Sequence, residues 1–256
     1  MKRIIRFEIK QGIYWGELDL SLGQVFFTEG SIYQDWARGE LAGSLDSVKI
    51  HPPCDPKQIV GLAYNYKDLV GKRQQYDEPL LFLKTPNVVV TSASPIQIPK
   101  QSGNTWVEVE LAVVLRESVF KASYDEASDA ILGVTVANDV TTQNLYSRDH
   151  HLARSKSLPS FCPLGDYLTT EVDTSNLKMT TEINGQVTQN SSTRERILNE
   201  IEAIMLISQY IPLSQGDLVL TGTPAGALES IVAPGDQVRL SIEELGTLIN
   251  KIELAV

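Results

Sequence analysis

The sequence predicts an α+β protein that is mainly β, and three observations lead to this class. Short runs rich in β-branched and aromatic residues, bounded by Gly, Pro, Asn or Asp, recur along the chain of 256 residues. Two turn sequences, Asn184-Gly185 and Leu245-Gly246, each separate a pair of such runs and predict hairpins. Helical periodicity is confined to a few short segments, so helices are expected to be a minority.

Composition excludes several classes of protein. A net charge of −10 argues against a nucleic-acid or anionic-membrane surface, although a bound cation would still allow an anionic substrate. No run approaches the roughly 18 apolar residues of a membrane span. Met1-Lys2-Arg3 starts like a signal peptide, but Arg6, Glu8 and Lys10 interrupt the apolar stretch that a signal peptide needs. Cys54 and Cys162 are therefore expected to be reduced thiols in a cytoplasmic protein.

Residues 1–50 are predicted to form a small N-terminal β domain. Its expected elements are a hairpin of Ile4–Ile9 and Ile13–Leu18 around Gln11-Gly12, a strand at Gln24–Thr28 and a helical stretch at Ile32–Arg38. The segment His51–Pro56 contains three prolines, which makes it a stiff linker. The domain boundary is therefore placed there, and a second domain is expected over residues 57–256.

Most strands are expected in this second domain. The predicted strands and hairpins are Ile59–Leu62, Leu80–Lys84, Pro95–Ile98, Trp106–Leu115, Ala130–Val140, Leu177–Asn190, Leu218–Thr221 and Gln237–Leu254. The predicted helices are Tyr124–Asp129, Thr141–His150, and one that Ser192 caps with Glu195 as the second half of a capping box. Ile197, Ile201, Ile204 and Met205 fall on one face of that last helix.

Glu108 and Glu110 lie two apart in the apolar run Trp106–Leu115. Side chains two apart on a strand point to the same face, so the two carboxylates are aimed at one spot. At roughly 5 Å and an effective dielectric of about 20, their repulsion is on the order of 3 kcal/mol. A positive partner or a shared proton must offset it, and a divalent cation is the simplest answer. The alternative is a half-exposed strand whose glutamates face water.

A second apolar strand, Ala130–Val140, carries a third acid, Asp139, at its end. The intervening segment leaves room for a short helix and a return strand beside the first. Two carboxylates from one strand and one from the tip of its neighbour would make a facial set of three oxygen ligands, with water and substrate in the other positions. This set suits Mg²⁺, Mn²⁺ or Ca²⁺ and not zinc, because no His or Cys accompanies it.

Two further segments are candidates for substrate contacts. Lys156 can hold a substrate carboxylate or stabilise an enolate, and a solvated loop charge is the alternative. The loop Thr221-Gly222-Thr223 follows a strand, and its amides and hydroxyls can form an anion nest; a plain strand-to-loop turn is the alternative. The adjacent His150-His151 makes a poor joint metal site, because neighbours on a helix point about 100° apart.

Taken together, the motifs of the second domain resemble those of the fumarylacetoacetate hydrolase family. The resemblance rests on Asn65-Tyr66, Pro79–Lys84, Val107–Val114, Asn138–Thr141, Lys156 with Phe161–Gly165, Asn184-Gly185, Gly216-Asp217 and Leu220–Pro224. It runs in order from about residue 57 to 254, and residues 1–50 resemble the N-terminal extension of many bacterial members. It implies a mixed β-sandwich roll, usually a homodimer, with a divalent cation.

The resemblance also implies a role for particular residues. Glu108, Glu110 and Asp139 would bind the cation, with Mg²⁺ expected and Mn²⁺ or Ca²⁺ as alternatives. Lys156 and the loop that carries Gly222 and Thr223 would bind the substrate's oxo-acid end, and further candidate contacts are Tyr66, Lys84 and Gln143. Family members isomerise, decarboxylate or hydrolyse small 2-oxo acids and their enols or dienoates, through an enolate that the metal stabilises by chelation.

One departure from the family pattern bears on the reaction. After Asn-Tyr, the hydrolytic members place a His and, three residues later, a Glu, which together activate water; here Leu69 and Lys72 stand in their place. A leucine cannot move a proton, so the usual base is missing, and Gln143 replaces the more familiar Arg. Lys156 and Asp68 are the remaining candidates for catalysis, with His150 as another proton carrier.

Isomerisation or decarboxylation is therefore expected in preference to hydrolysis, because neither strictly needs an activated water. The alternative is a family member that binds the cation and an oxo acid without turnover.

Overall fold

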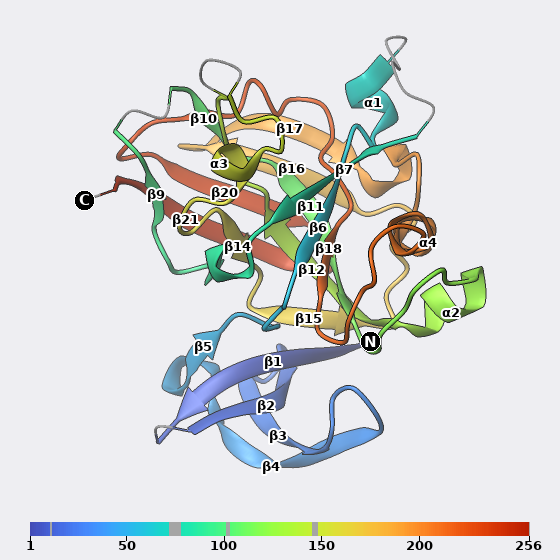
Figure 1. Cartoon of the computed structure of the whole chain (residues 1–256). Coiled ribbons are helices and arrows are strands. Elements are labelled where there is room, and N and C mark those ends of the chain that lie inside the picture. The colour runs from blue at the N-terminus through green and yellow to red at the C-terminus, as the bar shows by residue number, and fades with distance from the viewer. Residues whose placement is uncertain (11, 72–77, 101–102, 145–147, 256) are drawn as a thin grey trace.

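The computed structural model describes residues 1–10, 12–71, 78–100, 103–144 and 148–255. Over these residues the chain is mainly β with a few short helices, which confirms the predicted class (Figure 1). Gln11, which was expected in the first hairpin turn, and Lys72, which stands in the departure from the family pattern, lie outside the described residues.

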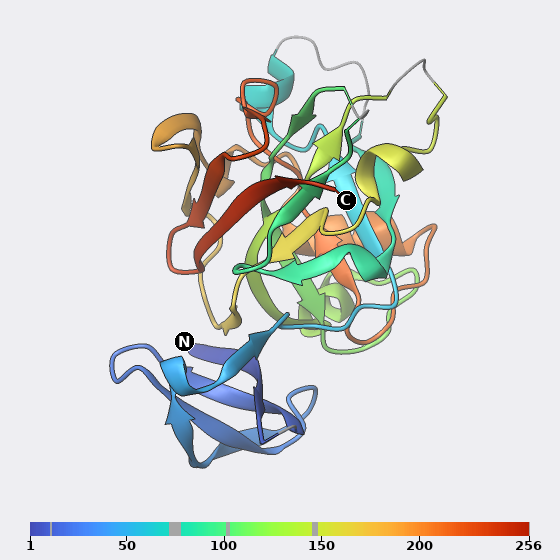
Figure 2. The ribbon, with the colours of Figure 1, turned by 90° about the vertical axis from the view of Figure 1, so that its left-hand side faces the viewer.

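The N-terminal unit is built from five strands. They are β1 (Lys2–Ile9), β2 (Gly12–Asp19), β3 (Gln24–Gly30), β4 (Trp36–Ser44) and β5 (Lys49–His51). Ile5, Phe7, Leu18 and Val25 form a small hydrophobic cluster of their own within this unit. Strand β1 also pairs antiparallel with β15 (Tyr167–Thr170), so the unit extends the main sheet at one end (Figure 2).

The helical stretch expected at Ile32–Arg38 is wrong. Ile32 and Tyr33 lie in a turn, and Trp36 begins β4. Gly30, with φ +92°, ends β3 and pairs with Trp36, so the chain reverses into a hairpin. Cross-strand pairing thus overrides a local pattern that was too short to specify a helix.

A mixed sheet forms the centre of the molecule, in the order β4-β3-β2-β1-β15-β12-β11-β18-β6-β7 among the described strands. Its remaining members are β6 (Ile59–Ala63), β7 (Leu80–Lys84), β8 (Val89–Thr91), β11 (Val109–Leu115), β12 (Ile131–Asn138), β14 (Cys162–Leu164) and β18 (Leu218–Leu220). Strand β18 pairs with β6 in parallel, whereas β11 pairs antiparallel with both β12 and β18. Every residue of β11 is buried, as its almost unbroken apolar sequence predicts.

A second sheet packs against β11 and β12 and completes the sandwich. Its order is β17-β16-β20-β21-β9, with β9 (Ile96–Ile98), β16 (Lys178–Ile183), β17 (Gln186–Ser192), β20 (Gln237–Ile242) and β21 (Gly246–Leu254). A small third sheet joins β10 (Thr105–Trp106), β13 (Thr141–Thr142) and β19 (Ile231–Val232). Asn184 and Gly185 both have positive φ in the β16–β17 turn, which confirms the hairpin predicted there.

The described helices are short. They are α1 (Lys67–Val70), α2 (Tyr124–Asp129), α3 (Ala153–Lys156) and α4 (Glu200–Ser208), with 3₁₀ turns at Leu45–Ser47, Pro86–Val88 and Thr193–Glu195. Helix α2 lies where it was predicted, and it contacts α4 at one side of the sheet (Figure 1). None of these helices is long and apolar enough to cross a bilayer.

Two helix predictions need correction. Ser192 caps only a 3₁₀ turn, whereas α4 begins at Glu200, where Asn199 and Glu202 form a complete capping box. The segment Thr141–His150 is not a helix in its described part, because Thr141 and Thr142 pair with β10 as β13.

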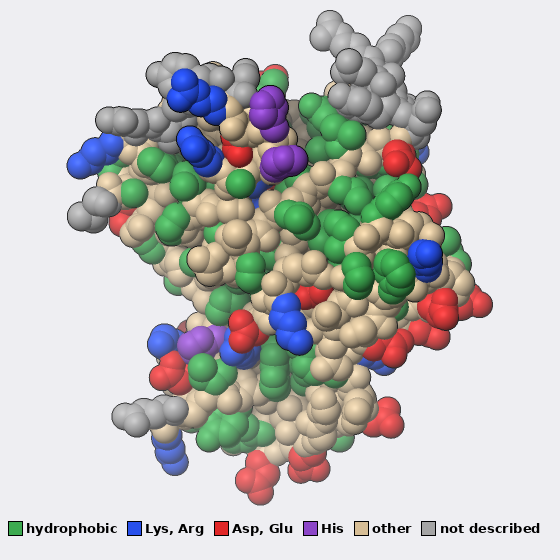
Figure 3. All heavy atoms as spheres, in the orientation of Figure 1, with side chains coloured by type: hydrophobic (Ala, Val, Ile, Leu, Met, Phe, Trp, Pro, Cys, Tyr) green, Lys and Arg blue, Asp and Glu red, His purple; other side chains and the backbone are tan. Residues whose placement is uncertain are grey.

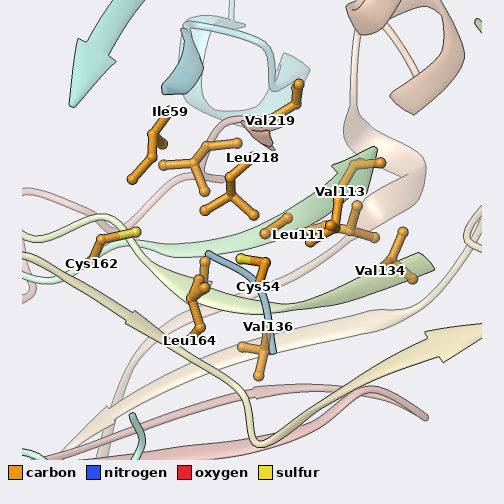
Figure 4. Packing of buried hydrophobic residues seen from close by; sticks show 14 of the residues in the cluster. Cys54, Ile59, Leu111, Val113, Val134, Val136, Cys162, Leu164, Leu218 and Val219 are labelled. Carbon is orange, nitrogen blue, oxygen red and sulfur yellow. The ribbon is translucent and has the colours of Figure 1, made fainter. Parts of the chain in front are cut away.

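Both cysteines lie in the main hydrophobic core. Figure 4 shows Cys54 and Cys162 among aliphatic side chains such as Leu111, Val136 and Leu164. Both thiols are free, as expected, and burial raises the pKa of Cys162 to about 12. Thiols held protonated in this way act as small apolar core groups.

Candidate active site

Three carboxylates converge where β11 begins and β12 ends. Glu110 is the second residue of β11, whereas Glu108 lies just before that strand, in a short break after β10. The expected single strand Trp106–Leu115 is therefore interrupted. Antiparallel pairing sets Val109 opposite Asn138, the last residue of β12, and the backbone amide of Asp139 donates to the carbonyl of Glu108 at 3.0 Å.

The three acids are buried and close together. Their exposed fractions are 9% for Glu108, 1% for Glu110 and 0% for Asp139. One oxygen from each lies within 4.8 Å of the others. The alternative of a half-exposed strand with solvated glutamates is thereby excluded, and the predicted proximity of the three carboxylates is confirmed.

Two lysines compensate part of this charge. The Nζ atom of Lys84 lies 2.5 Å from Oδ1 of Asp139 and 3.2 Å from the carbonyl of Val140. The Nζ atom of Lys156 donates to Oδ2 of Asp139 and, at 3.0 Å, to Oε2 of Glu108. Both oxygens of Asp139 therefore accept from a lysine.

Neutral donors orient the two glutamates. The indole N–H of Trp106 donates to Oε1 of Glu108 at 2.7 Å. The backbone N–H of Gly222 donates to Oε2 of Glu110, also at 2.7 Å. Gly222 has φ +93°, and a Cβ at this position would meet the carbonyl oxygen of Leu62 at 2.9 Å. Only glycine therefore fits this loop without strain, and the predicted anion nest donates to a carboxylate of the protein itself.

The pKa shifts show how incompletely the charges are balanced. Burial raises the pKa of Glu108, and burial together with repulsion from Asp139 and Glu108 raises the pKa of Glu110 well above its ordinary range. Burial would also raise the pKa of Asp139, but the ammonium groups of Lys156 and Lys84 hold it below its usual value. The negative charge that is not balanced by an ammonium group therefore lies mainly on Glu108 and Glu110.

This donor set fits a hard divalent cation. With all groups ionised, three carboxylates and two ammonium groups give −3 + 2 = −1. Glu110 has a backbone amide but no lysine among its hydrogen-bond partners in the described structure. A cluster of carboxylate oxygens without His or Cys ligands is the environment that Mg²⁺, Mn²⁺ and Ca²⁺ prefer.

A cavity of about 280 Å³ opens beside the cluster. Lys156 lies in its wall, and its Nζ atom is 4.4 Å from the ring centroid of Phe82, a cation–π distance. The other described lining residues are Leu62, Ala63, Tyr64, Leu69, Trp106, Glu108, Glu110, Thr141, Thr142, Asn144, Leu152, Ser155, Thr223, Ala227 and Leu228. This volume lies just below the roughly 300–1,000 Å³ of drug-sized pockets, so it suits a small substrate.

Six of the predicted site residues are absent from the described lining of this cavity. Asp139 and Gly222 lie behind it at the carboxylate cluster, and the others are Tyr66, Asp68, Lys84 and Gln143. Tyr66 is fully buried, and its hydroxyl donates to Sδ of Met179 at 3.1 Å. Gln143 is exposed, and it is held by Asn104 through its backbone. Asp68 accepts from the hydroxyl of Ser191 at 2.5 Å. Neighbours on a helix point about 100° apart, so Asp68 turns away from the cavity when Leu69 faces it.

Lys84 has no exposed side-chain surface and is absent from the described lining, and its ammonium group contacts Asp139. The adjacent histidines, His150 and His151, are exposed and are absent from the described lining (Figure 3 shows histidine side chains near the position of α3).

Sequence reasoning missed two supporting residues. Trp106 could have been found, because it continues the alternation of Glu108 and Glu110. Gln189 gave no signal: its amide donates to the hydroxyl of Thr223 and the carbonyl of Pro224, and its oxygen accepts from the amide of Val109, 80 residues away. It thus connects β17 to the segment between the two glutamates and to the Thr223 loop.

Comparison with known proteins identifies the family. Residues 58–253 match the family model described as fumarylacetoacetate (FAA) hydrolase C-terminal. The chain belongs to the fumarylacetoacetate hydrolase family. An uncharacterized protein of Archaeoglobus fulgidus is 36% identical over 208 residues, which cover 80% of this chain and 82% of that protein.

Other members of the family are named for a reaction. The oxaloacetate tautomerase of Bacillus subtilis is 31% identical over 252 residues, covering 90% of this chain and 83% of that protein. The solved structure of the 2-hydroxyhepta-2,4-diene-1,7-dioate isomerase of Mycobacterium marinum is 30% identical and superposes over 99% of both chains with a TM-score of 0.90. Leu69 lies in the wall of the described cavity.

Proposed function

We propose that this member of the fumarylacetoacetate hydrolase family isomerises a small 2-oxo acid between its enol and keto forms. Glu108, Glu110 and Asp139 would hold a divalent cation, Mg²⁺ in the first instance. One observation supports the choice of reaction. The described cavity wall contains the ammonium group of Lys156, and it contains the aliphatic side chain of Leu69, which cannot serve as the catalytic base that hydrolysis would need. Such a site can stabilise charge on an oxygen, but it lacks the imidazole that would activate water for C–C hydrolysis.

The cation, when bound, would act as a Lewis acid on the carboxylate and the adjacent oxygen of the oxo acid. The protein's own residues do the rest. Trp106 and Gly222 hold Glu108 and Glu110 in a fixed orientation. Leu69 and Phe82 line the space beside the carboxylates, and a substrate that fills this space would displace water and strengthen the electrostatic interactions there.

Lys156 is the proposed proton carrier. Burial would lower its pKa, but Asp139, Glu108 and Glu110 raise it above the ordinary lysine value, so the side chain starts as an ammonium ion. Ketonisation requires that C3 gains one proton and that the enol hydroxyl loses one. The Nζ atom can deliver a proton to C3 and recover one from the hydroxyl, which leaves the lysine charged at the end of the cycle.

The names of the relatives support this reaction class, since both the tautomerase and the isomerase move protons without adding water. The test uses a panel of 2-oxo acids that includes oxaloacetate and 4-methyl-2-oxopentanoate, with Mg²⁺ or Mn²⁺ present. Exchange of C3 hydrogen for deuterium is followed by NMR, and products of C–C cleavage are sought with acylpyruvates. We expect exchange that falls at least 100-fold in Lys156→Met. Cleavage of an acylpyruvate without faster exchange of any oxo acid would refute the proposal.

A further inference from the structure

The cavity has one charged end and an otherwise uncharged wall. Its charged lining residues are Glu108, Glu110 and Lys156, within the part of the chain that the structure describes. Its apolar lining side chains include Leu62, Leu69, Phe82, Trp106 and Leu152, and also Leu228, which is largely exposed. The described cavity wall contains no basic residue besides Lys156.

The neighbouring basic residues that the structure describes do not add a cation to the cavity wall. Arg148 and Arg154 flank the histidine pair before and within α3, and both are exposed and absent from the described lining. Lys84 is buried behind Asp139 and already serves that carboxylate and the carbonyl of Val140. Gln143 is uncharged and exposed.

The charge count limits the charge of the substrate. The cluster carries −1 from three carboxylates and two ammonium groups, and a divalent cation changes this to +1. A single substrate carboxylate then neutralises the site. A second carboxylate on the substrate would give the site a net charge of −1, and the described cavity wall holds no basic residue besides Lys156 to pair with it.

We propose, on the basis of the proposed function, that the substrate is a monocarboxylic 2-oxo acid with an apolar tail. The 2-oxo acid head lies at the carboxylate cluster and Lys156, and the tail contacts the half-buried side chains of Leu69 and Leu152. Substrate selection in this protein therefore rests on exclusion of a second negative charge as well as on attraction of an apolar group.

A matched pair of substrates tests this proposal. Oxaloacetate and 4-methyl-2-oxopentanoate have the same number of non-hydrogen atoms and the same branching, but one ends in a carboxylate and the other in an isopropyl group. The rate of C3 deuterium exchange is measured for each with the Mg²⁺-loaded enzyme and divided by its rate without enzyme at the same Mg²⁺ concentration. We expect kcat/KM, normalised in this way, to be at least 10-fold higher for 4-methyl-2-oxopentanoate.

The outcomes separate the two proposals. A preference for oxaloacetate overturns the present inference and leaves the proposed isomerisation intact. If the enzyme accelerates exchange of no 2-oxo acid in the panel, the proposed function fails instead. A binding measurement without turnover gives a second criterion: malate and 2-hydroxy-4-methylpentanoate, titrated calorimetrically into the wild-type protein, should bind in the same order of preference, and tighter binding of malate overturns the inference.

A variant provides the converse test. Leu69→Arg places a cation in the apolar wall and should shift the ratio of the two normalised kcat/KM values toward oxaloacetate by at least 10-fold. Leu69→Met keeps the wall apolar and should retain the wild-type preference. An unchanged ratio in a folded Leu69→Arg protein contradicts the assignment of this wall to the tail, and the wild-type measurements decide the matter if that variant does not fold.

Discussion

The Nζ atom of Lys84 lies 2.5 Å from Oδ1 of Asp139, and neither side chain has any exposed surface. The other oxygen of Asp139 accepts from Lys156, which lies in the cavity wall. The two lysines therefore have different positions around one carboxylate. Lys84 contacts Asp139 from inside the protein, whereas Lys156 contacts Asp139 from the cavity wall, where we propose that the substrate binds.

Removal of Lys84 should destabilise the fold. Lys84→Met leaves Asp139 buried with one ammonium partner fewer, and loss of one member of a buried ion pair costs about 3–5 kcal/mol. Urea unfolding of the chelator-treated protein measures this change. Lys57→Met, at an exposed position, is the matched control and should change the free energy of unfolding by less than about 0.5 kcal/mol. Equal small effects of the two substitutions would contradict the assigned role.

The N–H group of Gly222 should be needed for cation affinity. Gly222→Ala strains a backbone with φ +93° and should cost about 1–3 kcal/mol of stability. It also displaces the donor to Glu110, so Mn²⁺ affinity, measured by electron paramagnetic resonance, should fall at least 10-fold.

Gly185→Ala is the control for Gly222→Ala, because it introduces backbone strain at a positive φ away from the carboxylate cluster. Gly185 has φ +81° in the β16–β17 turn and open space around it, so the change should cost about 1–2 kcal/mol and leave Mn²⁺ affinity as it is. If both variants bind Mn²⁺ equally well, the N–H group of Gly222 does not orient a ligand.

The indole N–H of Trp106 should raise the affinity of the carboxylate cluster for a divalent cation, because it orients Glu108. Trp106→Phe keeps an aromatic wall but removes the N–H that donates to Glu108, and such supporting hydrogen bonds are worth about 10–100-fold in metal affinity. We expect a loss in that range by Mn²⁺ titration. Trp36→Phe, in the N-terminal unit, should bind Mn²⁺ like the wild type. An unchanged affinity in Trp106→Phe would show that Glu108 needs no such orientation.

The free energy of unfolding of the metal-free protein should depend on pH, and a bound divalent cation should reduce this dependence. Glu110 binds its proton more tightly in the folded protein, mainly because of burial. Its contribution is thus fully present below the unfolded pKa of about 4.3 and is lost as the pH rises through the higher folded value. Asp139 acts in the opposite direction, because its stabilising contribution is lost as the pH falls through its lowered pKa.

Thermal unfolding of chelator-treated protein above about pH 4.5 measures the contribution of Glu110. The fall in stability with rising pH should be smaller with saturating Mg²⁺ and smaller in Glu110→Gln. Glu117→Gln, at an exposed position, should follow the wild type. Parallel curves for all of these samples would show that Glu110 does not carry the uncompensated charge.

Much of the fold and of the carboxylate cluster could be predicted from the sequence, because period and spacing act locally. Alternation placed Glu108 and Glu110 on one face, and the apolar run of β12 predicted a neighbouring strand that ends at Asp139. The Asn184-Gly185 turn specified its hairpin by backbone conformation alone.

The remaining features depend on contacts between distant segments. Lys84 pairs with a residue 55 positions away, so the sequence could not show that it contacts Asp139 behind the described cavity lining. The same reason hid Gln189. The predicted helix at Ile32–Arg38 failed because pairing of β3 with β4 outweighs local propensity.

Titration of the chelator-treated protein with Mn²⁺ by calorimetry tests the central claim most directly, with wild type and Glu110→Gln compared under the same conditions. The carboxylate cluster predicts one binding site per chain in the wild type and none at millimolar Mn²⁺ in the variant. Equal binding by both proteins, or no binding by the wild type, would contradict it.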